Sequence, residues 1–515
     1  MAAGGGEWSD PLAVHAVMDR RAFVRRAAAL AAAAGTGTSL LAGCGSDASA
    51  PNSLSPSTTL VPVRYDLDEP YWMQGGYGPV SMETETFALS VSGRLPSSLN
   101  GLYVRNGSNP ASEASPHWFL GDGMVHGVRL ANGKAEWYRN RYIRTPMYAA
   151  KAAFLGSGAP GGASNQSNVS VFGHGGRLLT SGEVGFPYEI SATDLSTIGV
   201  YDFDGALKTA MTAHPKIDPS TGHMHFFGYG FVPPYLTYHV ADADGRLISS
   251  QQVDVAGPTM MHDFAITDRD VIFWELPVIF DLQAAVAAMD PNAADGGGFP
   301  FKWDPTYGSR IGIMPLGGPT SQIRWVEIDP CYVFHGVNAF RDGDNVVMEV
   351  CRLHSMFAAT PDPRPNAVHR WTVNTSGSDL QFNDEIICDL RMDLPAIDHR
   401  RIGRHHDNAW YINVERDSDG IGEFTGVTRR NTRSGMLDRY EPGRRYRMNE
   451  GSFVAADAEP DGDGWFMAYA WDRSRNTSDL MVFDAHDLAA GPVATVHLPV
   501  RVPYGFHGWW VPDQT

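Results

Sequence analysis

The sequence predicts an all-β protein, built either as a β-propeller or as a large assembly of β-sandwiches. Short apolar or alternating runs recur from residue 60 to the C-terminus. Turn-forming residues separate these runs, and the chain has 55 glycines and 34 prolines among its 515 residues. Asp-Gly and Asn-Gly pairs between the runs are typical of β-hairpins. Many short strands and few helical periods favour a propeller or stacked sandwiches over any helical fold.

The expected strands follow one another at short intervals along the chain. They are Leu102–Val104, Met124–Leu130, Arg177–Thr180, His223–Phe227, Val271–Leu276, Asn345–Val350, Ala409–Val414, Gly464–Ala470 and Asp479–Phe483. Hairpin turns are expected at residues 131–133, 242–245, 341–344 and 461–464. Phe280–Met289 is the exception, because its apolar residues recur at helical spacing. This segment is expected to form a cap helix, with an apolar surface that dips into lipid as the alternative.

Composition and charge exclude several classes of protein. Hydrophobic residues make up 43% of the chain, which permits a large core, and the formal net charge is −18. An acidic chain without a basic run is not expected to bind nucleic acid, because phosphate contacts need clustered Lys and Arg. The four cysteines are Cys44, Cys331, Cys351 and Cys388, and they form no CxxC pair, which argues against a thiolate zinc site. Free buried thiols are favoured over a Cys331–Cys351 bridge.

The N-terminus has the features of an export signal. Arg20–Arg26 resembles a twin-arginine motif, and an alanine-rich apolar run from Ala27 to Leu41 follows it. That run is too short for a confident membrane-spanning helix. Leu41–Cys44 resembles a bacterial lipobox, with Cys44 as the lipidated residue. The alternative is an ordinary amphipathic or disordered N-terminus.

These features divide the chain into three parts. Residues 1–43 are the expected twin-arginine and lipoprotein signal peptide, and Met18 is an alternative start. Residues 44–59 are rich in Ser, Ala, Pro and Asn and are expected to form a flexible tether. Residues 60–515 form the folded part. The mature protein is therefore expected to be exported by the twin-arginine route. It would be lipid-anchored on the outer side of the bacterial cell membrane and contact that membrane peripherally.

Histidine is the residue type that indicates chemistry. Four of the eighteen histidines lie in apolar or glycine-flanked settings, and the triplet Phe-His-Gly occurs twice, at residues 334–336 and 506–508. The four are His214, His262, His335 and His507. His126 and His174 fit a His-Gly pattern equally well, so spacing alone does not select a metal site.

Several stretches in one order make the chain resemble the carotenoid cleavage oxygenase family. They are residues 100–107 (NGLYVRNG), 117–127 (HWFLGDGMVHG), 141–145 (RYIRT), 213–215 (AHP), 261–263 (MHD), 334–336 (FHG) and 505–508 (GFHG). The resemblance implies a seven-bladed β-propeller with a few capping helices and loops over its top face. It also implies a non-haem Fe(II) ion on the propeller axis. The four iron ligands would be His214, His262, His335 and His507, whereas His126 and His174 would be structural.

The implied ligand set fits the chemistry of the residues. Neutral imidazoles suit Fe(II), and four of them leave coordination positions open for dioxygen. A ligand imidazole needs a hydrogen bond at its second nitrogen, which fixes its tautomer and orientation. In the family, three glutamates supply these bonds, and the matching positions are Glu183, Glu423 and Glu450. Glu183 matches the family pattern, whereas the proline that usually follows such a glutamate is missing at the other two, where Thr425 and Gly451 stand nearby.

The resemblance implies a dioxygenase that cleaves a conjugated C=C bond of a carotenoid or apocarotenoid with O₂ and releases two carbonyl products. Apolar walls would select the bond, and no protein acid or base would be needed beyond the metal site. One alternative is a stilbene-type enzyme for phenolic alkenes, for which Lys134 and Lys151 are the nearby lysines. A second is a non-catalytic pigment-binding lipoprotein, and a third is isomerisation without O₂.

Overall fold

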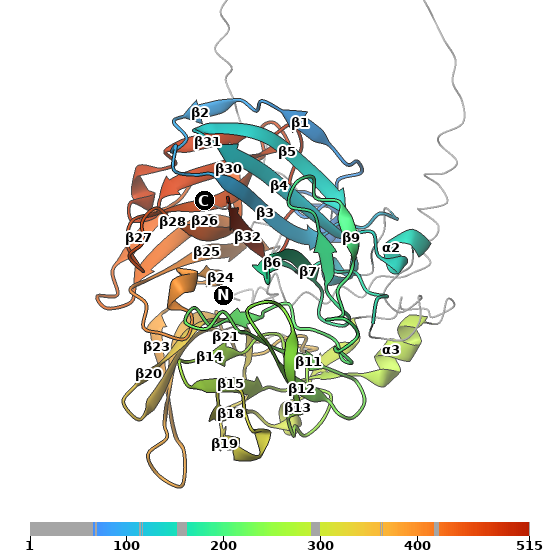
Figure 1. The fold of residues 1–515 in the computed structure, drawn as a ribbon, viewed down its shortest axis with the longest axis vertical. Coiled ribbons are helices and arrows are strands. Elements are labelled where there is room, and N and C mark those ends of the chain that lie inside the picture. Colours follow the sequence, from blue (N-terminus) through green and yellow to red (C-terminus); the bar gives the residue numbers. More distant parts are fainter. Residues whose placement is uncertain are drawn as a thin grey trace, which may run out of the picture.

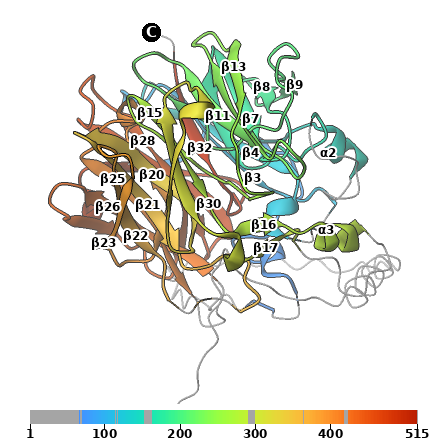
Figure 2. The same ribbon diagram turned by 90° about the horizontal axis from the view of Figure 1, so that it is seen from below.

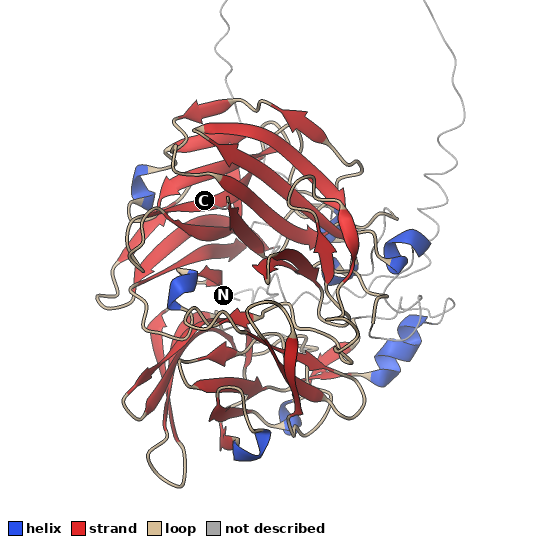
Figure 3. Ribbon diagram, in the orientation of Figure 1, coloured by secondary structure: helices blue, strands red, loops and turns tan. Residues whose placement is uncertain are grey.

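The computed structural model describes residues 65–513, apart from 67–68, 113–114, 116, 152–161, 290–298, 361, 363 and 417–421. Seven sheets of four or five antiparallel strands surround a common centre, in the order of the sequence colours (Figure 1). Strands dominate the described part, and its two α-helices lie at the periphery (Figure 3). The fold is the seven-bladed β-propeller that the resemblance implied. The expected signal peptide, Cys44 and the tether lie outside the described residues.

Blades 2 to 6 each contain four consecutive main strands. Blade 2 has β6 (Ser170–His174), β7 (Arg177–Ser181), β8 (Tyr188–Ile190) and β9 (Thr197–Val200), and blade 3 has β10 (Lys216–Ile217), β11 (Met224–Tyr229), β12 (Leu236–Ala241) and β13 (Leu247–Gln252). Blade 4 has β14 (Ala265–Ile266), β15 (Asp270–Glu275), β18 (Arg310–Pro315) and β19 (Arg324–Glu327). Blade 5 has β20 (Tyr332–Asp342), β21 (Asn345–Leu353), β22 (Ala367–Asn374) and β23 (Gln381–Cys388), and blade 6 has β24 (Met392–Ala396), β25 (Asn408–Arg416), β26 (Gly422–Asn431) and β27 (Leu437–Tyr440).

Blades 1 and 7 combine strands from both ends of the chain and close the ring. Blade 1 has the order β1 (Glu85–Phe87), β5 (Lys134–Tyr142), β4 (Gly123–Ala131), β3 (Gly101–Ser108) and β32 (Gly508–Pro512). Blade 7 has the order β2 (Val91–Gly93), β31 (Ala494–His497), β30 (Thr477–Asp484), β29 (Gly464–Asp472) and β28 (Tyr446–Ala455). The C-terminal β32 thus becomes the innermost strand of the first blade, next to β3.

Burial explains why these runs form strands. All residues of β3 are buried, because middle strands pack against neighbouring blades on both faces. The outer strand β13 instead alternates between partly buried and exposed positions, which is the pattern of a strand with one solvated face. Apolar side chains fill the space between blades. One such cluster joins blades 5 and 6 through residues such as Val337, Cys351 and Tyr411.

Most expected elements are confirmed. The expected strands lie within β3, β4, β7, β11, β15, β21, β25, β29 and β30, with an end shifted by one residue at β11 and β15. The expected hairpin turns fall between paired strands. Cys331 and Cys351 are unpaired buried thiols.

The helix expected at Phe280–Met289 is α3 (Leu282–Met289), and Phe280 instead ends the strand β16 (Val278–Phe280). β16 pairs with β17 (Phe301–Trp303), and this hairpin and α3 lie beside each other at one face (Figure 2). The other helix of the described part is α2 (Pro146–Ala150). Short 3₁₀ helices are η1 (Tyr71–Met73), η2 (Trp118–Leu120), η3 (Pro305–Tyr307), η4 (Thr320–Gln322), η5 (His399–Arg401) and η6 (Leu488–Ala490). Within the described residues, no helix has the length and apolar character needed to cross a membrane.

Truncating the chain after Val502 should strongly destabilise the fold. The cut removes β32, which pairs with β3 from Gly101↔Pro512 to Arg105↔Gly508, and it removes the fully buried Tyr504. Losing a buried aromatic side chain alone costs about 3–5 kcal/mol. Thermal unfolding followed by circular dichroism should show a markedly lower midpoint, and a chain ending at Asp513 is the control. An unchanged midpoint in the truncated chain would contradict the role of β32 in ring closure.

Candidate metal centre

Inner strands of four blades place the four histidines near the propeller centre. His214 precedes β10, His262 precedes β14, His335 lies on β20, and His507 directly precedes β32. Neighbouring inner strands contact one another around the centre, among them β14 with β20 and β28 with β32. Side chains at the ends of these strands therefore meet, although up to 293 residues separate them in the sequence (507 − 214).

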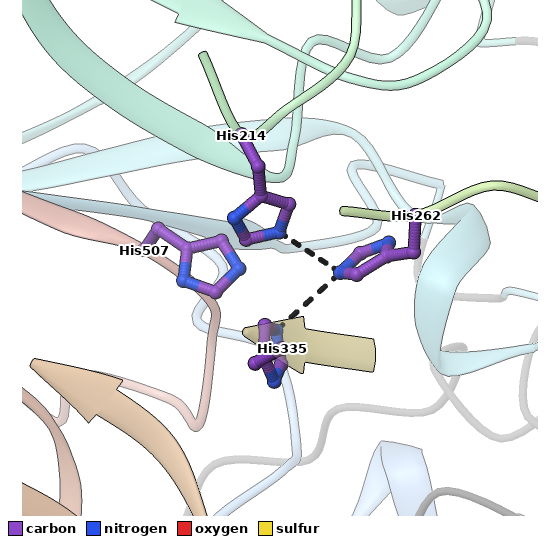
Figure 4. A group of neighbouring side chains, drawn as sticks. All are labelled: His214, His262, His335 and His507. Atoms are coloured by element: carbon purple, nitrogen blue, oxygen red, sulfur yellow. Dashed lines mark hydrogen bonds between the residues drawn. The ribbon is translucent and has the colours of Figure 1, made fainter. Parts of the chain in front are cut away.

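The four imidazoles converge on one point (Figure 4). One potential ligand atom from each lies within 4.8 Å of the others. The Nε2 atoms of His214 and His262 are 2.9 Å apart, and those of His262 and His335 are 3.4 Å apart. Metal–imidazole bonds of about 2.0–2.1 Å at right angles put adjacent nitrogen atoms about 3 Å apart. The spacing therefore fits one metal ion held by neighbouring imidazoles.

Burial keeps two of the four imidazoles in the neutral form that binds a metal. Burial lowers the pKa of His214 well below its usual value, and the nearby His507 lowers this pKa further. Burial also lowers the pKa of His335. Both imidazoles are therefore neutral near pH 7, with a lone pair available for coordination.

Carboxylates orient two of the imidazoles by contacting the Nδ1 atom, which faces away from the centre of the cluster. The Nδ1 atom of His262 contacts Oε1 of Glu183, whose Oε2 accepts a hydrogen bond of 2.8 Å from the Tyr229 hydroxyl. The Nδ1 atom of His507 lies 2.7 Å from Oε1 of Glu450, whose Oε2 accepts a 2.8 Å bond from the Gly508 amide. A carboxylate at Nδ1 holds the proton there and leaves Nε2 free to face the centre.

The structure corrects the prediction for Glu423. Its Oε1 accepts a 2.6 Å bond from the hydroxyl of Tyr65, and its Oε2 accepts a 2.7 Å bond from that of Tyr504. Arg447 lies 3.1 Å from Oε2 and completes this buried group. Glu423 is on β26, the third strand of blade 6 from the centre, so it ties the N-terminal segment to the C-terminal one instead of contacting an imidazole.

Asp393 takes the place that was predicted for Glu423. It lies on β24, the innermost strand of blade 6, and its Oδ1 is 2.7 Å from Nδ1 of His335. The same oxygen accepts a 2.8 Å bond from the Leu394 amide. The prediction missed this residue because it considered only glutamates. A carboxylate within the apolar run Met392–Pro395 was the signal in the sequence.

Irregular strand pairing aims several of these side chains at the centre. The register of β20 shifts between Val333 and Gly336, on either side of His335. Similar shifts occur at Asp393 on β24 and around Glu450 on β28. A bulge adds a residue to one strand and turns its side chains, which is why bulges recur beside functional sites.

The C-terminal segment reaches the centre by backbone pairing and a close approach. His507 donates from its backbone N–H to Val169 O at 3.0 Å, and its carbonyl accepts a 3.1 Å bond from the Asn106 N–H. The buried guanidinium of Arg105 donates to Pro503 O at 2.6 Å. A Cβ at Gly505 would lie 2.2 Å from Arg105 Nη1, so only glycine fits this position.

Asp263 connects the segments that carry three of the histidines. Its buried carboxylate follows His262 directly and pairs at 2.7 Å with Lys216, two residues after His214. Its Oδ2 accepts a 2.9 Å bond from the Gly336 amide, next to His335. One carboxylate thereby fixes the spacing of blades 3, 4 and 5 at the centre.

The other two candidate histidines have structural partners, as implied. Nδ1 of His126 lies 2.9 Å from the Tyr138 hydroxyl, and Nε2 of His174 lies 3.0 Å from Gly222 O. Neither belongs to the four-histidine cluster.

A cavity with predominantly apolar walls adjoins three of the histidines, His262, His335 and His507. Aromatic rings form much of its wall. They come from η2, from β17 and the segment that precedes it, from the strands β20 and β26, and from the C-terminal segment. These rings are Phe119, Phe299, Phe301, Phe334, Phe424 and Phe506. The wall can therefore hold an apolar molecule beside the point where the imidazoles converge and exclude water from it.

The fold and this site define a β-propeller protein with an all-histidine centre, and comparisons with known proteins assign its family. The family model described as retinal pigment epithelial membrane protein matches residues 77–512. The carotenoid cleavage oxygenase of Mycobacterium tuberculosis is 36% identical over 501 residues, which cover 87% of this chain and 98% of that protein. Carotenoid 9,10(9',10')-cleavage dioxygenase 1 of Phaseolus vulgaris is 31% identical, covering 88% and 92%.

A solved structure agrees with these matches. The lignostilbene dioxygenase of Pseudomonas brassicacearum superposes with a TM-score of 0.78 and 26% identity, covering 86% of this chain and 99% of that one. The chain belongs to the carotenoid cleavage oxygenase family and is an enzyme of that family.

Replacing Asp393 by Asn should weaken metal binding about 10- to 100-fold, because an amide does not hold the proton on Nδ1 of His335 as a carboxylate does. Isothermal titration of the apoprotein with Co(II) measures this affinity. The matched variant Glu423→Gln should bind the metal normally but lose about 1–3 kcal/mol of folding stability, since its charged bond to Arg447 is lost. Weaker metal binding in Glu423→Gln, with normal binding in Asp393→Asn, would reverse the assignment.

Proposed function

We propose that this chain is an Fe(II)-dependent dioxygenase that cleaves a conjugated C=C bond of a carotenoid or apocarotenoid. The reaction breaks the C=C and O–O bonds and forms two C=O bonds, so each carbonyl product takes one oxygen atom from O₂. The observation that carries the proposal is the convergence of four imidazoles beside an aromatic-walled cavity.

The residues present fit Fe(II). The four histidines would hold it through Nε2, and imidazole ligands suit Fe(II) while leaving open positions in its coordination sphere. When bound, iron would supply the activation of dioxygen that this chemistry needs. Glu183, Asp393 and Glu450 would keep three of the imidazoles in one tautomer and orientation.

The chain's own residues would position the substrate. Flat aromatic rings along the cavity wall suit a long polyene, because they bury its apolar surface and select the double bond nearest the centre. The fully buried Phe334 and His335 are consecutive, so one strand, β20, supplies both a wall residue and a proposed ligand. No protein acid or base is required beyond the metal site.

Cavity polarity favours a polyene over a phenolic alkene. A phenolate would need a nearby cation, and the described residues that line the cavity include no Lys or Arg. Lys134 begins β5 and Lys151 follows α2, and neither is among these residues. Cleavage of a stilbene-type alkene remains the second candidate, because the solved lignostilbene dioxygenase shares this fold and 26% of its residues.

A substrate panel tests the activity. Iron-loaded protein is incubated under air with carotenoids, apocarotenoids and stilbenes, and the carbonyl products are identified by mass spectrometry. We expect two aldehyde or ketone fragments from a polyene and about one iron per chain, since the four ligands serve one ion. Stilbene fragments alone would establish the second candidate, and a rearranged polyene without added oxygen would indicate isomerisation.

The matched variant for this panel is His262→Ala, which should lose both iron and product formation. Iron-free wild-type protein that only binds the pigment would instead indicate a binding protein.

We further propose that the enzyme is exported by the twin-arginine route and anchored through a lipid on Cys44 to the outer side of the bacterial cell membrane. The order of the arginine motif, the apolar run and the cysteine supports this. The route carries folded proteins, so the metal would be bound before export. An anchor would hold the enzyme at the membrane, where apolar polyenes partition.

Replacing Cys44 with Ser should release the protein from bacterial membranes, because the acyl-accepting thiol is absent. Fractionation of cells followed by immunoblotting measures this, and the control is Cys388→Ser, which keeps the lipobox. If the Cys44→Ser protein stays with the membranes, lipidation at this residue is wrong.

A further inference from the structure

A second cavity, of about 490 Å³, runs along the propeller axis and reaches the four-histidine cluster. Residues on the innermost strands of all seven blades line it, from β6, β10, β14, β20, β24, β28 and β32. It touches His214, His335 and His507, whereas the aromatic cavity touches His262, His335 and His507. The cluster therefore lies between two cavities that differ in their walls.

The wall of this axial cavity is mostly apolar, but it exposes more polar surface than the wall of the aromatic cavity. Its polar lining residues include Lys216, Asp263, Asn338, His399, Glu450 and Ser452. The cations in the wall are compensated: Lys216 pairs with Asp263 at 2.7 Å, and Arg400 pairs with Asp398 at 2.7 Å. No unpaired positive charge among the described lining residues would repel a divalent cation on its way to the cluster.

The axial cavity extends to exposed residues. Pro219 and His399 both line it and are both solvent-exposed. The imidazole of His399 stacks on the indole of Trp509, with ring centroids 4.6 Å apart. Trp509 follows His507 by two residues and also lines the axial cavity. This stacked pair therefore connects the exposed His399 with the segment that carries His507.

The difference in polarity between the two cavities indicates that they admit different molecules, an ion in one case and an apolar compound in the other. A divalent ion gives up its hydration shell reluctantly, and moving a charge into apolar surroundings is energetically unfavourable. The wall of the axial cavity is more polar than that of the aromatic cavity, so an ion passing along the axis would meet a smaller cost. We propose that the axial cavity is the route by which an aqueous divalent metal ion reaches and leaves the four-histidine site, and that His399 lines this route.

Metal uptake by the apoprotein tests the route with Co(II), whose visible absorption reports coordination by imidazole. His399→Trp and Pro219→Trp place a larger ring in the axial cavity, each at an exposed position, and circular dichroism checks that each variant is folded. Leu120→Trp is the matched variant in the aromatic cavity, which Leu120 lines from a partly exposed position. His399→Ala removes the stacked ring and leaves the axial cavity open. Stopped-flow mixing gives the uptake rate, and excess chelator gives the release rate.

We expect His399→Trp or Pro219→Trp to slow both uptake and release at least about tenfold. Because both rates change together, the affinity should stay near that of the wild type. Leu120→Trp and His399→Ala should take up Co(II) at least as fast as the wild type.

Unchanged rates in both axial tryptophan variants would overturn the proposal, as would slow uptake in Leu120→Trp with normal uptake in the axial variants. The inference rests on metal binding at the proposed site but not on any substrate. A wild-type chain that binds no Co(II) at all would therefore overturn the proposed function as well.

Discussion

The pairing of β32 with β3 is the contact on which both the ring and the site depend. The last strand enters the first blade, and the first short strand of blade 7, β2, comes from the N-terminal side. Closure packs the first blade against the last, so neither end of the row leaves an apolar sheet face exposed, and the blades keep only short edges. The same pairing fixes His507, which directly precedes β32, at the propeller axis. The side chains of the other three histidines meet it there. Stability and site geometry are therefore consequences of one closure.

The structure must also accommodate four imidazoles packed closely together at its centre. Burial and the nearby imidazoles lower the pKa of His214 and His335, so these two side chains are neutral near pH 7. Three of the outer nitrogens contact carboxylates from other blades: that of His262 contacts Glu183 from blade 2, that of His335 contacts Asp393 from blade 6, and that of His507 contacts Glu450 from blade 7. The propeller thus brings four imidazoles and three carboxylates to one centre, one group from each of its seven blades.

Local patterns in the sequence predicted the strands well, because alternating burial and Asp-Gly turns are properties of neighbouring residues. They could not decide between a propeller and sandwiches, since the number and order of blades depend on contacts between distant strands. Spacing alone also did not distinguish His214 from His126. The distinction depends on which strand lies innermost in each blade. Only the resemblance to a family predicted it from the sequence.

Glu423 and Asp393 show where the prediction failed and why. Both carboxylates are buried, but one lies on the third strand of blade 6 and the other on the first. A sequence pattern does not report the distance of a strand from the axis. Bulges beside His335, Asp393 and Glu450 add a further change in side-chain direction that strand periodicity does not predict.

X-ray diffraction at the iron absorption edge tests the central claim most directly, namely that the four converging imidazoles hold one iron ion. Crystals of protein purified with iron should give a single strong anomalous peak per chain, at the point faced by the Nε2 atoms of His214, His262, His335 and His507. Fully occupied crystals with no peak there, or with iron bound only elsewhere, would contradict the account.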